Sequence, residues 1–307
     1  MIRFGLCCIF REEPIRFRQT TAASLSRLNR DAQLQKISGI CLDNLKNLLL
    51  AVGWVDNHKT GAFRVLSPLF PRFTHPDVGY RLDILPDKDE ILSLCSTVKN
   101  FCNTRDIRLS LHPDQFNILS SPHDHVVANT LRELEYQGLL AELIGAELIN
   151  IHAGGIYTGK EGAISRFQKN FRLLSNAVRS RLTVENDDRC YTPEDLFPLC
   201  RNLEIPFVYD VHHHRCLPDR LDVEEATERC IQSWTALGRE PFFHLSSPKH
   251  GWGAAKRQPH SDYIDVADFP HCWTHLTCTI DIEAKAKELA VLRLKKDVAN
   301  LTVEKRA

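Results

Sequence analysis

The sequence has no long apolar run and no recognisable export segment. Its longest apolar stretch, residues 48–55, is interrupted by Gly53 and falls far short of the ~20 residues that a membrane helix needs. The N-terminal segment MIRFGLCCIFREE has only a short apolar run and no small-residue cleavage pattern, so no signal peptide is expected. These absences argue against a secreted or membrane-spanning protein and predict a cytoplasmic one.

Paired cysteines and an excess of one charge are also missing. The eleven cysteines contain no C-x-x-C pair, which excludes zinc ribbons and thioredoxin-type redox motifs. Without an export signal they are expected to be reduced and mostly buried. The 39 basic and 39 acidic residues cancel, which excludes a strongly basic DNA-coating protein but not a local basic surface. Histidine, by contrast, is abundant, with fourteen residues.

The order of β-rich and amphipathic segments predicts the fold class. Short β-rich runs alternate with longer helical patterns and no linker interrupts them, which favours βα repetition and a parallel sheet. Eight strands are expected, at Ile2–Cys8, Phe63–Leu66, Arg108–His112, Leu148–His152, Leu182–Glu185, Phe207–Asp210, Phe242–His244 and Thr277–Glu283. Eight helices are expected, at Leu34–Val52, Asp89–Asn103, Val126–Ile144, Glu161–Arg179, Pro193–Leu203, Val223–Leu237, Val266–His275 and Ala284–Leu301. The sequence therefore predicts a (β/α)8 TIM barrel, one domain over residues 1–307, with a doubly wound open sheet as the alternative.

Polar and apolar residues alternate within these strands. Ser110 and His112 alternate with leucines, and the same pattern recurs in the strands that end at His152, Glu185 and Glu283. In a barrel the apolar set can pack under the helices while the polar set points inward. Each polar set then ends in a metal-capable side chain at the carboxyl end of its strand, where barrel enzymes have their active sites.

Seven metal-capable residues lie at or just past a strand end: His112, His152, Glu185, Asp210, His213, His244 and Glu283. Nitrogen and carboxylate ligands without thiolates suit Zn²⁺ or Mn²⁺, and three carboxylates could bridge more than one ion. A cluster of ions can bind the attacking and leaving oxygens of a phosphodiester. Any one of these residues is as readily an ordinary core or surface residue, but together they predict a metal centre, because buried unpaired charge is costly.

The stretch from Gly154 to Lys160 fits the first seven positions of a phosphate-binding P-loop, between a predicted strand and a helix. The eighth position is Glu161, where a Ser or Thr hydroxyl is needed for Mg²⁺ and a carboxylate would repel phosphates. An NTP-hydrolysing protein is therefore disfavoured. Glycines that let the backbone approach a DNA phosphate beside His152 explain the stretch better, with Lys160 as a candidate backbone contact.

Two further segments have competing interpretations. His212, His213 and His214 cannot all point at one site, so some of the three are expected on the surface. The acid-free stretch from Ser247 to His260 carries Trp252, Lys249, Lys256 and Arg257 after the seventh strand. A basic, aromatic loop at the rim of the site could follow a nucleic-acid backbone, with Lys256 and Arg257 as contacts. An ordinary solvated loop is the alternative.

Together the motifs resemble those of one family, the UV damage endonucleases, DNA repair enzymes related in fold to endonuclease IV. The motifs that carry the resemblance are LSLHPDQF (Leu109–Phe116), INIHAGG (Ile149–Gly155), VENDDR (Val184–Arg189), YDVHHHR (Tyr209–Arg215), FHLSS (Phe243–Ser247) and IDIEAKAKE (Ile280–Glu288). They occur in the family's order over most of the chain.

The resemblance implies a site and a substrate. It implies a barrel that holds three divalent ions, with Mn²⁺ preferred and Zn²⁺ or Mg²⁺ as alternatives, and that cuts duplex DNA immediately 5′ of a UV photoproduct. It assigns the seven residues above as ligands, with His75 (THPD) and His260 (PHSDY) as two more. Glu185, His152 and Glu283 become the catalytic candidates, and Glu185 fits a bridging role best. The implied partner is UV-damaged double-stranded DNA, with no membrane and no obligate protein partner, in the cytoplasm and at the nucleoid in a prokaryote.

Gln115 and Phe116 match the pair with which such enzymes probe the duplex opposite a lesion. A damaged dinucleotide stacks poorly, so it costs less to flip out, and an inserted ring would fill the vacated space. A core aromatic is the alternative for Phe116. Three departures concern this chain: Phe116 stands where the family often has Tyr, Leu6 where members can carry a Tyr that touches the lesion, and Phe242 where some have a lysine that becomes carboxylated beside the metals.

Three other functions remain compatible with the residues. A metal-dependent apurinic endonuclease would use the same barrel and ligands. A sugar isomerase would use the same metal chemistry but would have no need for Gln115, Phe116 or a basic rim. A non-enzymatic DNA-binding module would have no need for convergent metal ligands.

Overall fold

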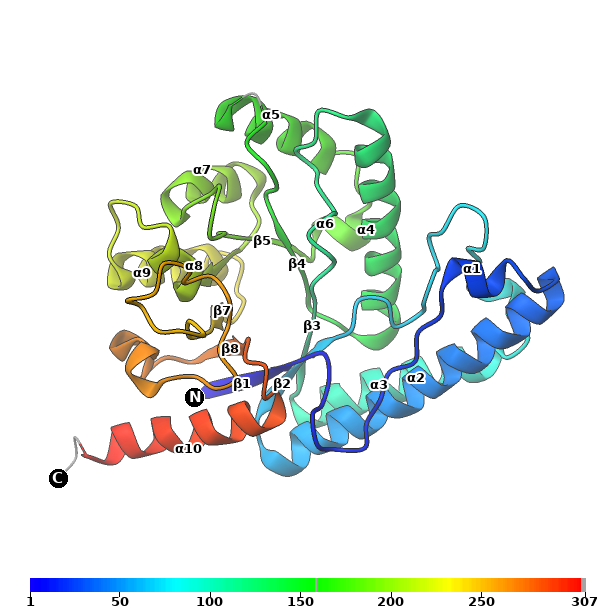
Figure 1. The fold of residues 1–307 in the computed structure, drawn as a ribbon, viewed down its shortest axis with the longest axis horizontal. Coiled ribbons are helices and arrows are strands. Elements are labelled where there is room, and N and C mark those ends of the chain that lie inside the picture. Colours follow the sequence, from blue (N-terminus) through cyan, green and yellow to red (C-terminus); the bar gives the residue numbers. More distant parts are fainter. Residues whose placement is uncertain (158, 305–307) are drawn as a thin grey trace.

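The computed structural model describes residues 1–157 and 159–304, and its eight strands close into a parallel barrel in chain order (Figure 1). The strands are β1 (Ile2–Cys7), β2 (Gly61–Val65), β3 (Arg108–Leu111), β4 (Leu148–His152), β5 (Leu182–Glu185), β6 (Phe207–Asp210), β7 (Phe242–Leu245) and β8 (Cys278–Ile282). Ile2 of β1 pairs with Cys278 of β8, so the sheet has no free edge. The predicted TIM barrel is confirmed, and the doubly wound open sheet is excluded.

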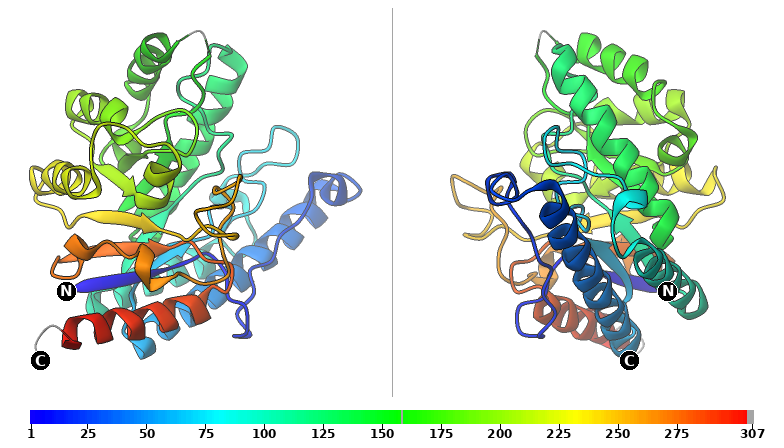
Figure 2. Two further views of the ribbon diagram at one scale, coloured as in Figure 1. Left: turned by 60° about the vertical axis from the view of Figure 1, so that its left-hand side comes forward. Right: turned by 90° about the vertical axis from the view of Figure 1, so that its right-hand side faces the viewer.

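The helices surround the barrel (Figure 2). They are α1 (Ala22–Leu25), α2 (Arg30–His58), α3 (Lys88–Arg105), α4 (Asp124–Ile144), α5 (Lys160–Phe171), α6 (Asn176–Arg179), α7 (Pro193–Leu203), α8 (Val211–Cys216), α9 (Val223–Thr235) and α10 (Glu288–Glu304), with 3₁₀ turns at η1 (Leu82–Ile84), η2 (Val266–Asp268) and η3 (His271–Trp273). Local sequence explains several of the helix starts. Thr192 and Asp195 form a capping box around Pro193 in α7, and Asp222 and Glu225 form another at α9. No helix among the described residues is long and apolar enough to cross a bilayer.

Two predicted helices differ from the structure. The helix expected over Glu161–Arg179 is two helices, α5 and α6, because the N–H of Ser175 donates to Glu135 Oε1 of α4 (2.7 Å) and not to a carbonyl of its own helix. The helix expected over Val266–His275 is only η2 and η3, since Pro270 between them lacks an N–H and cannot continue a helical ladder. Helix α8, directly after β6, was not expected.

The barrel interior is polar and layered, as the strand alternation predicts. At the amino-terminal ends, the buried guanidinium of Arg108 donates to Thr279 Oγ1 (2.7 Å) and Glu240 Oε1 (3.2 Å). Higher up, Thr183 Oγ1 donates to Asn150 Oδ1 (2.9 Å). Gly5 leaves room in this layer: a Cβ there would lie 1.9 Å from Asp281 Oδ1. Hydrogen bonds therefore connect polar side chains in successive layers of the barrel, from the amino ends of the strands toward their carboxyl ends.

Candidate metal centre

Glu185, at the end of β5, lies at the centre of the predicted ligands. Its carboxylate is buried, and its two oxygens face different histidines. Oε2 lies 3.1 Å from His112 Nε2, whereas Oε1 lies 3.0 Å from His244 Nδ1 and 3.3 Å from His213 Nδ1. The ring of His152 is 5.3 Å from that of His112, between centroids. Four strands and the first turn of α8 thus bring these residues together.

Asp210 and Glu283 complete the set of seven. Asp210 caps α8 by accepting the N–H of His213 (2.8 Å), which folds that histidine back toward Glu185. Glu283 Oε1 lies 3.4 Å from His244 Nδ1. The ligand atoms form three overlapping metal-capable groups: His112, His152 and Glu185; His112, His244 and Glu283; and Glu185, Asp210 and His213. Glu185 belongs to two groups, as a carboxylate that bridges neighbouring ions would, and His112 also belongs to two.

The unsatisfied atoms of this cluster fit divalent metal ions. His152 Nδ1, Glu185 Oε1, Asp210 Oδ2 and His244 Nδ1 are buried and have no hydrogen-bond partner. Buried polar atoms without a hydrogen bond are rare because each costs free energy, and coordination of cations would satisfy all four. The donors are nitrogens and carboxylate oxygens without thiolate, which suits Mn²⁺ or Zn²⁺.

The charges of the cluster support one another. Burial raises the pKa of Glu185, but the charge of His244 and the hydrogen bonds from His112 and His213 outweigh burial and hold that pKa well below its usual range. Glu283 behaves alike, because Arg64 and His244 outweigh its burial and keep its pKa low. Burial lowers the pKa of His152, and Glu185 only partly opposes this, so the imidazole favours its neutral, ligating form. Both carboxylates are therefore ionised at neutral pH.

Sequence reasoning missed Arg64 and Asp281, which hold the cluster from below. The guanidinium of Arg64 donates to Asp281 Oδ2 (2.8 Å) and Glu283 Oε1 (2.6 Å) and lies 2.8 Å from His244 Nε2. Asn150 Nδ2 donates to Glu185 Oε2 at 2.5 Å. Strand alternation placed Asn150 and Asp281 on the inward face, so it could have identified them as supports. Arg64 is not a ligand type, and its role depends on the register of β2.

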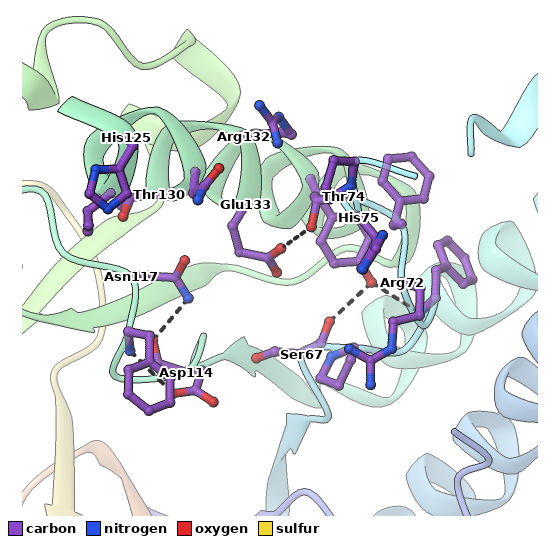
Figure 3. A pocket seen from close by; sticks show the side chains of 18 of the residues that line it. Ser67, Arg72, Thr74, His75, Asp114, Asn117, His125, Thr130, Arg132 and Glu133 are labelled. Atoms are coloured by element: carbon purple, nitrogen blue, oxygen red, sulfur yellow. Dashed lines mark hydrogen bonds between the residues drawn. The ribbon is translucent and has the colours of Figure 1, made fainter. Parts of the chain in front are cut away.

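Two of the nine predicted ligands lie outside the three groups. His260 Nδ1 lies 3.6 Å from Glu283 Oε2, and its ring is 6.2 Å from that of His213, so it borders the cluster. His75 lies instead in a neighbouring pocket of about 760 Å³ between the β2–α3 and β3–α4 loops, where Thr74 bonds to Glu133 of α4 (Figure 3). Its Nδ1 accepts the N–H groups of Asp77 and Val78 (3.2 and 3.4 Å). Its assignment as a ligand stays a prediction.

The expectation that some of the three consecutive histidines are surface residues is wrong. His212 and His214 are both buried. His214 bonds to Tyr209 Oη (2.8 Å) and Asp219 Oδ1 (3.0 Å), and His212 packs against the ring of Trp252. Helix α8 points the three rings in different directions, so only His213 reaches Glu185. The other two histidines contact the surrounding loops.

The predicted DNA-contacting residues lie around the mouth. Gln115 is exposed, and Phe116 is 72% exposed, so Phe116 is not a core aromatic. Lys256 and Arg257 are exposed on the loop after β7, where the indole of Trp252 donates to Asp268 Oδ1 (2.7 Å). Lys160 differs: its ammonium lies 2.5 Å from Asp195 Oδ2, so its charge is already paired within the protein.

Two of the positions at which this chain departs from the family's usual residues, Leu6 and Phe242, are buried. Leu6 is fully buried in the apolar core, since its neighbour Gly5 faces the barrel interior and Leu6 therefore faces the helices. Phe242 is buried below His244, and the guanidinium of Arg108 lies over its ring at 5.4 Å. No lysine stands at this position, and Arg64 makes the close contact with His244.

Comparison with known proteins agrees with the resemblance in the motifs. The chain is 31% identical to the UV DNA damage endonuclease of Bacillus velezensis, with 100% of this chain and 97% of that protein covered. It is 33% identical to the UV-damage endonuclease of Schizosaccharomyces pombe over 95% of this chain and 50% of that longer protein. The crystal structure of SacUVDE superimposes with a TM-score of 0.86 at 26% identity, covering 98% of this chain and 99% of that one. Endonuclease IV from Thermus thermophilus, at 14% identity and a TM-score of 0.61, shares the fold. The sequence model of the UV-endonuclease UvdE matches residues 2–306, and the chain belongs to this family of DNA repair endonucleases.

Proposed function

We propose that the protein nicks the phosphodiester backbone of duplex DNA immediately 5′ of UV photoproducts and that it needs divalent metal ions to do so. The observation that carries this proposal is the convergence of four buried ligand atoms that have no hydrogen-bond partner, on His152, Glu185, Asp210 and His244, at the carboxyl ends of the strands. Membership of the family supports the choice of substrate: the two relatives compared above are named UV DNA damage endonuclease and UV-damage endonuclease.

The residues of the three metal-capable groups would hold three ions, with Mn²⁺ preferred and Zn²⁺ or Mg²⁺ as alternatives. When bound, such ions supply Lewis-acid chemistry that neutralises phosphate charge and lowers the pKa of water. Glu185 would bridge, because its two oxygens face different histidines. His152, kept neutral by burial, presents a lone pair, and Glu283 is held in its ionised form by Arg64. His75 and His260 are proposed as outer ligands.

Around this centre the exposed groups of the mouth would bind DNA. Gln115 and Phe116 would enter the duplex at the lesion, while Lys256 and Arg257 would contact its backbone. Lys160 is a weaker candidate because Asp195 already compensates its charge. A duplex DNA substrate also supports the expectation that the protein acts in the cytoplasm, at the nucleoid in a prokaryote.

The test is a nicking assay on supercoiled plasmid. With Mn²⁺, the protein should convert UV-irradiated plasmid to the nicked circle and leave unirradiated plasmid intact. An end-labelled duplex with one defined photoproduct should be cut immediately 5′ of it, which a sequencing gel measures. A plasmid with abasic sites serves as the comparison: cutting confined to that plasmid would identify an apurinic endonuclease and refute the proposal.

A further inference from the structure

The glycine-rich segment from Ala153 to Gly155, directly after β4, is held by its neighbours. Ser120 Oγ donates to the carbonyl of Ala153 (2.6 Å), and the hydroxyl of buried Tyr191 donates to the carbonyl of Gly155 (3.4 Å). Gly154, at φ +93°, packs so closely on the β3–α4 loop that a Cβ there would lie 2.5 Å from Ile118 Cγ2. The two neighbouring loops therefore form one unit at the mouth of the barrel.

Tyr157 stands at the end of this held loop in an unfavourable backbone conformation. Its φ is +50°, a left-handed value that costs free energy for a residue with a bulky side chain. Tyr157 is 43% exposed, and the buried part of its ring packs on Gly155, where a Cβ would lie 3.4 Å from Tyr157 Cε2. A residue such as Gly or Asn would fit the backbone better. A partly exposed aromatic side chain therefore stands at a position whose backbone conformation disfavours it.

Arg166 of α5 keeps the ring of Tyr157 in place. Its guanidinium lies 5.8 Å from the ring centroid, and its Nε donates to the carbonyl of Ser120 (2.8 Å). The cation is thus fixed between the two loops, and the ring lies against it. Little conformational entropy would be lost when such a pre-positioned ring meets a ligand.

The position of Tyr157 parallels that of Phe116 on the adjacent strand. Phe116 follows the ligand candidate His112 by four residues, and Tyr157 follows His152 by five. Strands β3 and β4 are paired, and the rings of His112 and His152 are 5.3 Å apart. Two neighbouring strands therefore each carry a metal-capable histidine at the end and an exposed aromatic side chain beyond it.

We propose that Tyr157 is a second stacking residue, whose ring packs on an unpaired nucleobase of the bound DNA beside the position that Phe116 probes. This inference rests on the proposed function. Aromatic side chains stack on any base that is out of its pair, because every base has a π-face. The contact would form only where the duplex is opened, so Tyr157 would contribute to discrimination between damaged and intact DNA. Arg166 acts through Tyr157 as a positioning residue.

The backbone conformation allows a test in which stability and binding change in opposite directions. Tyr157→Gly removes the ring and relieves the left-handed strain, so the melting temperature should stay equal or rise. Affinity for a duplex with one photoproduct should fall roughly 5- to 100-fold, and affinity for the matched intact duplex should change by less than about twofold. Tyr157→Phe should retain wild-type affinity for both duplexes. Tyr157→Asn, which also tolerates a left-handed φ, should behave like the glycine variant.

Glu204→Gly is the matched control. Glu204 is exposed at a similar φ of +54°, at the end of α7 and ahead of the amino end of β6, on the side opposite the mouth. Its replacement should stabilise the protein without altering the ratio of the two affinities. The inference is overturned if Tyr157→Gly binds damaged duplex as tightly as the wild type, or if both duplexes lose affinity equally. Wild-type protein that fails to nick irradiated plasmid would instead refute the proposed function.

Discussion

Asn150 of β4 donates a hydrogen bond of 2.5 Å to Glu185 Oε2 on the adjacent strand β5, and Oε1 of the same carboxylate is left without a hydrogen-bond partner. Thr183 holds the amide of Asn150 in turn, through Asn150 Oδ1 (2.9 Å). The support thus comes from the inward-facing layer directly below the ligands. It fixes the orientation of Glu185, and therefore the direction in which each of its two oxygens faces the surrounding ligands.

The first prediction concerns the charge of Glu185. Glu185→Gln keeps the size of the side chain but removes the charge that would bridge two ions. We expect nicking of irradiated plasmid to fall by more than about 100-fold, since such ions contribute several kcal/mol to the transition state. The metal-free variant should stay folded, although its melting temperature should fall, because the neighbouring histidines stabilise the ionised carboxylate. Near-normal nicking at saturating Mn²⁺ would show that Glu185 does not bridge.

A second prediction concerns metal removal. Exhaustive treatment with EDTA should abolish nicking, and Mn²⁺ should restore it better than Mg²⁺. Histidine nitrogens suit Mn²⁺ and Zn²⁺, whereas Mg²⁺ favours oxygen and water. The measurement is the initial nicking rate on irradiated plasmid after addition of each metal, with bound metal determined by elemental analysis. Full recovery in Mg²⁺ alone would contradict a histidine-rich centre.

The third prediction concerns acid stability away from the site. Glu288 begins α10, is buried, and accepts the N–H groups of Arg11 (2.7 Å), Glu12 (2.6 Å) and Glu13 (3.3 Å). Burial raises the pKa of Glu288, but these backbone donors outweigh it and leave the pKa below its usual value. A carboxyl with a depressed pKa stabilises the fold above its unfolded pKa of about 4.3, and this stability is lost as the pH falls through the folded pKa.

Glu288→Gln should therefore lower the free energy of unfolding by about 1–3 kcal/mol at neutral pH. The difference from the wild type should shrink as the pH falls below the unfolded pKa of about 4.3 and through the lower folded pKa. Urea denaturation over a series of pH values from neutral downward measures both quantities. A difference that is independent of pH would mean that the three N–H groups do not stabilise the charged form.

Strand alternation explains why so much of the centre could be predicted from the sequence. Glu185 and His152 end strands whose inward residues are polar, and closure of the barrel then brings the strand ends together. The strand pattern does not show directly that the sheet closes, but eight successive βα units predicted a closed barrel. The same logic could not reach Arg64, because its role depends on how β2 aligns with β8 across the barrel.

Loops and short helices limited the prediction elsewhere. His75 lies on a loop whose path depends on contacts with α4. Its distance from the metal centre therefore could not be predicted from the THPD motif. The run His212–His214 gives no periodic pattern, and the cap at Asp210 that turns it into α8 becomes visible only with the strand end in place. Tyr157 lies within the stretch that resembles a P-loop, and that resemblance predicts no separate role for its side chain.

The fourth prediction concerns the basic loop after β7. Lys256 and Arg257 are exposed, and neither forms an ion pair with another described residue. Replacing both with Ala should weaken binding to damaged and undamaged duplex about equally. It should also reduce the slope of log Kd against log salt by about 1–2, since each lost phosphate contact releases one counterion fewer. Fluorescence anisotropy at a series of salt concentrations tests this, with Lys169→Ala on the exposed side of α5 as the control. An unchanged slope would move the backbone contacts to another part of the surface.

The last prediction separates recognition of the lesion from cleavage, through Phe116. This side chain is 72% exposed and projects from the loop that follows His112, so it is free to enter the duplex. Phe116→Ala should remove a stacking surface of about 1–3 kcal/mol per base, which is roughly a 5- to 100-fold loss of productive complex on damaged duplex. Bound metal should be unchanged, because the ring lies outside the metal-capable groups. Phe116→Tyr should retain activity. On a single-stranded substrate with the same photoproduct the Ala variant should lose much less, since no partner bases there need support after the lesion is flipped out. Equal losses on the two substrates, or a loss of metal, would mean that Phe116 supports the loop and does not probe the DNA.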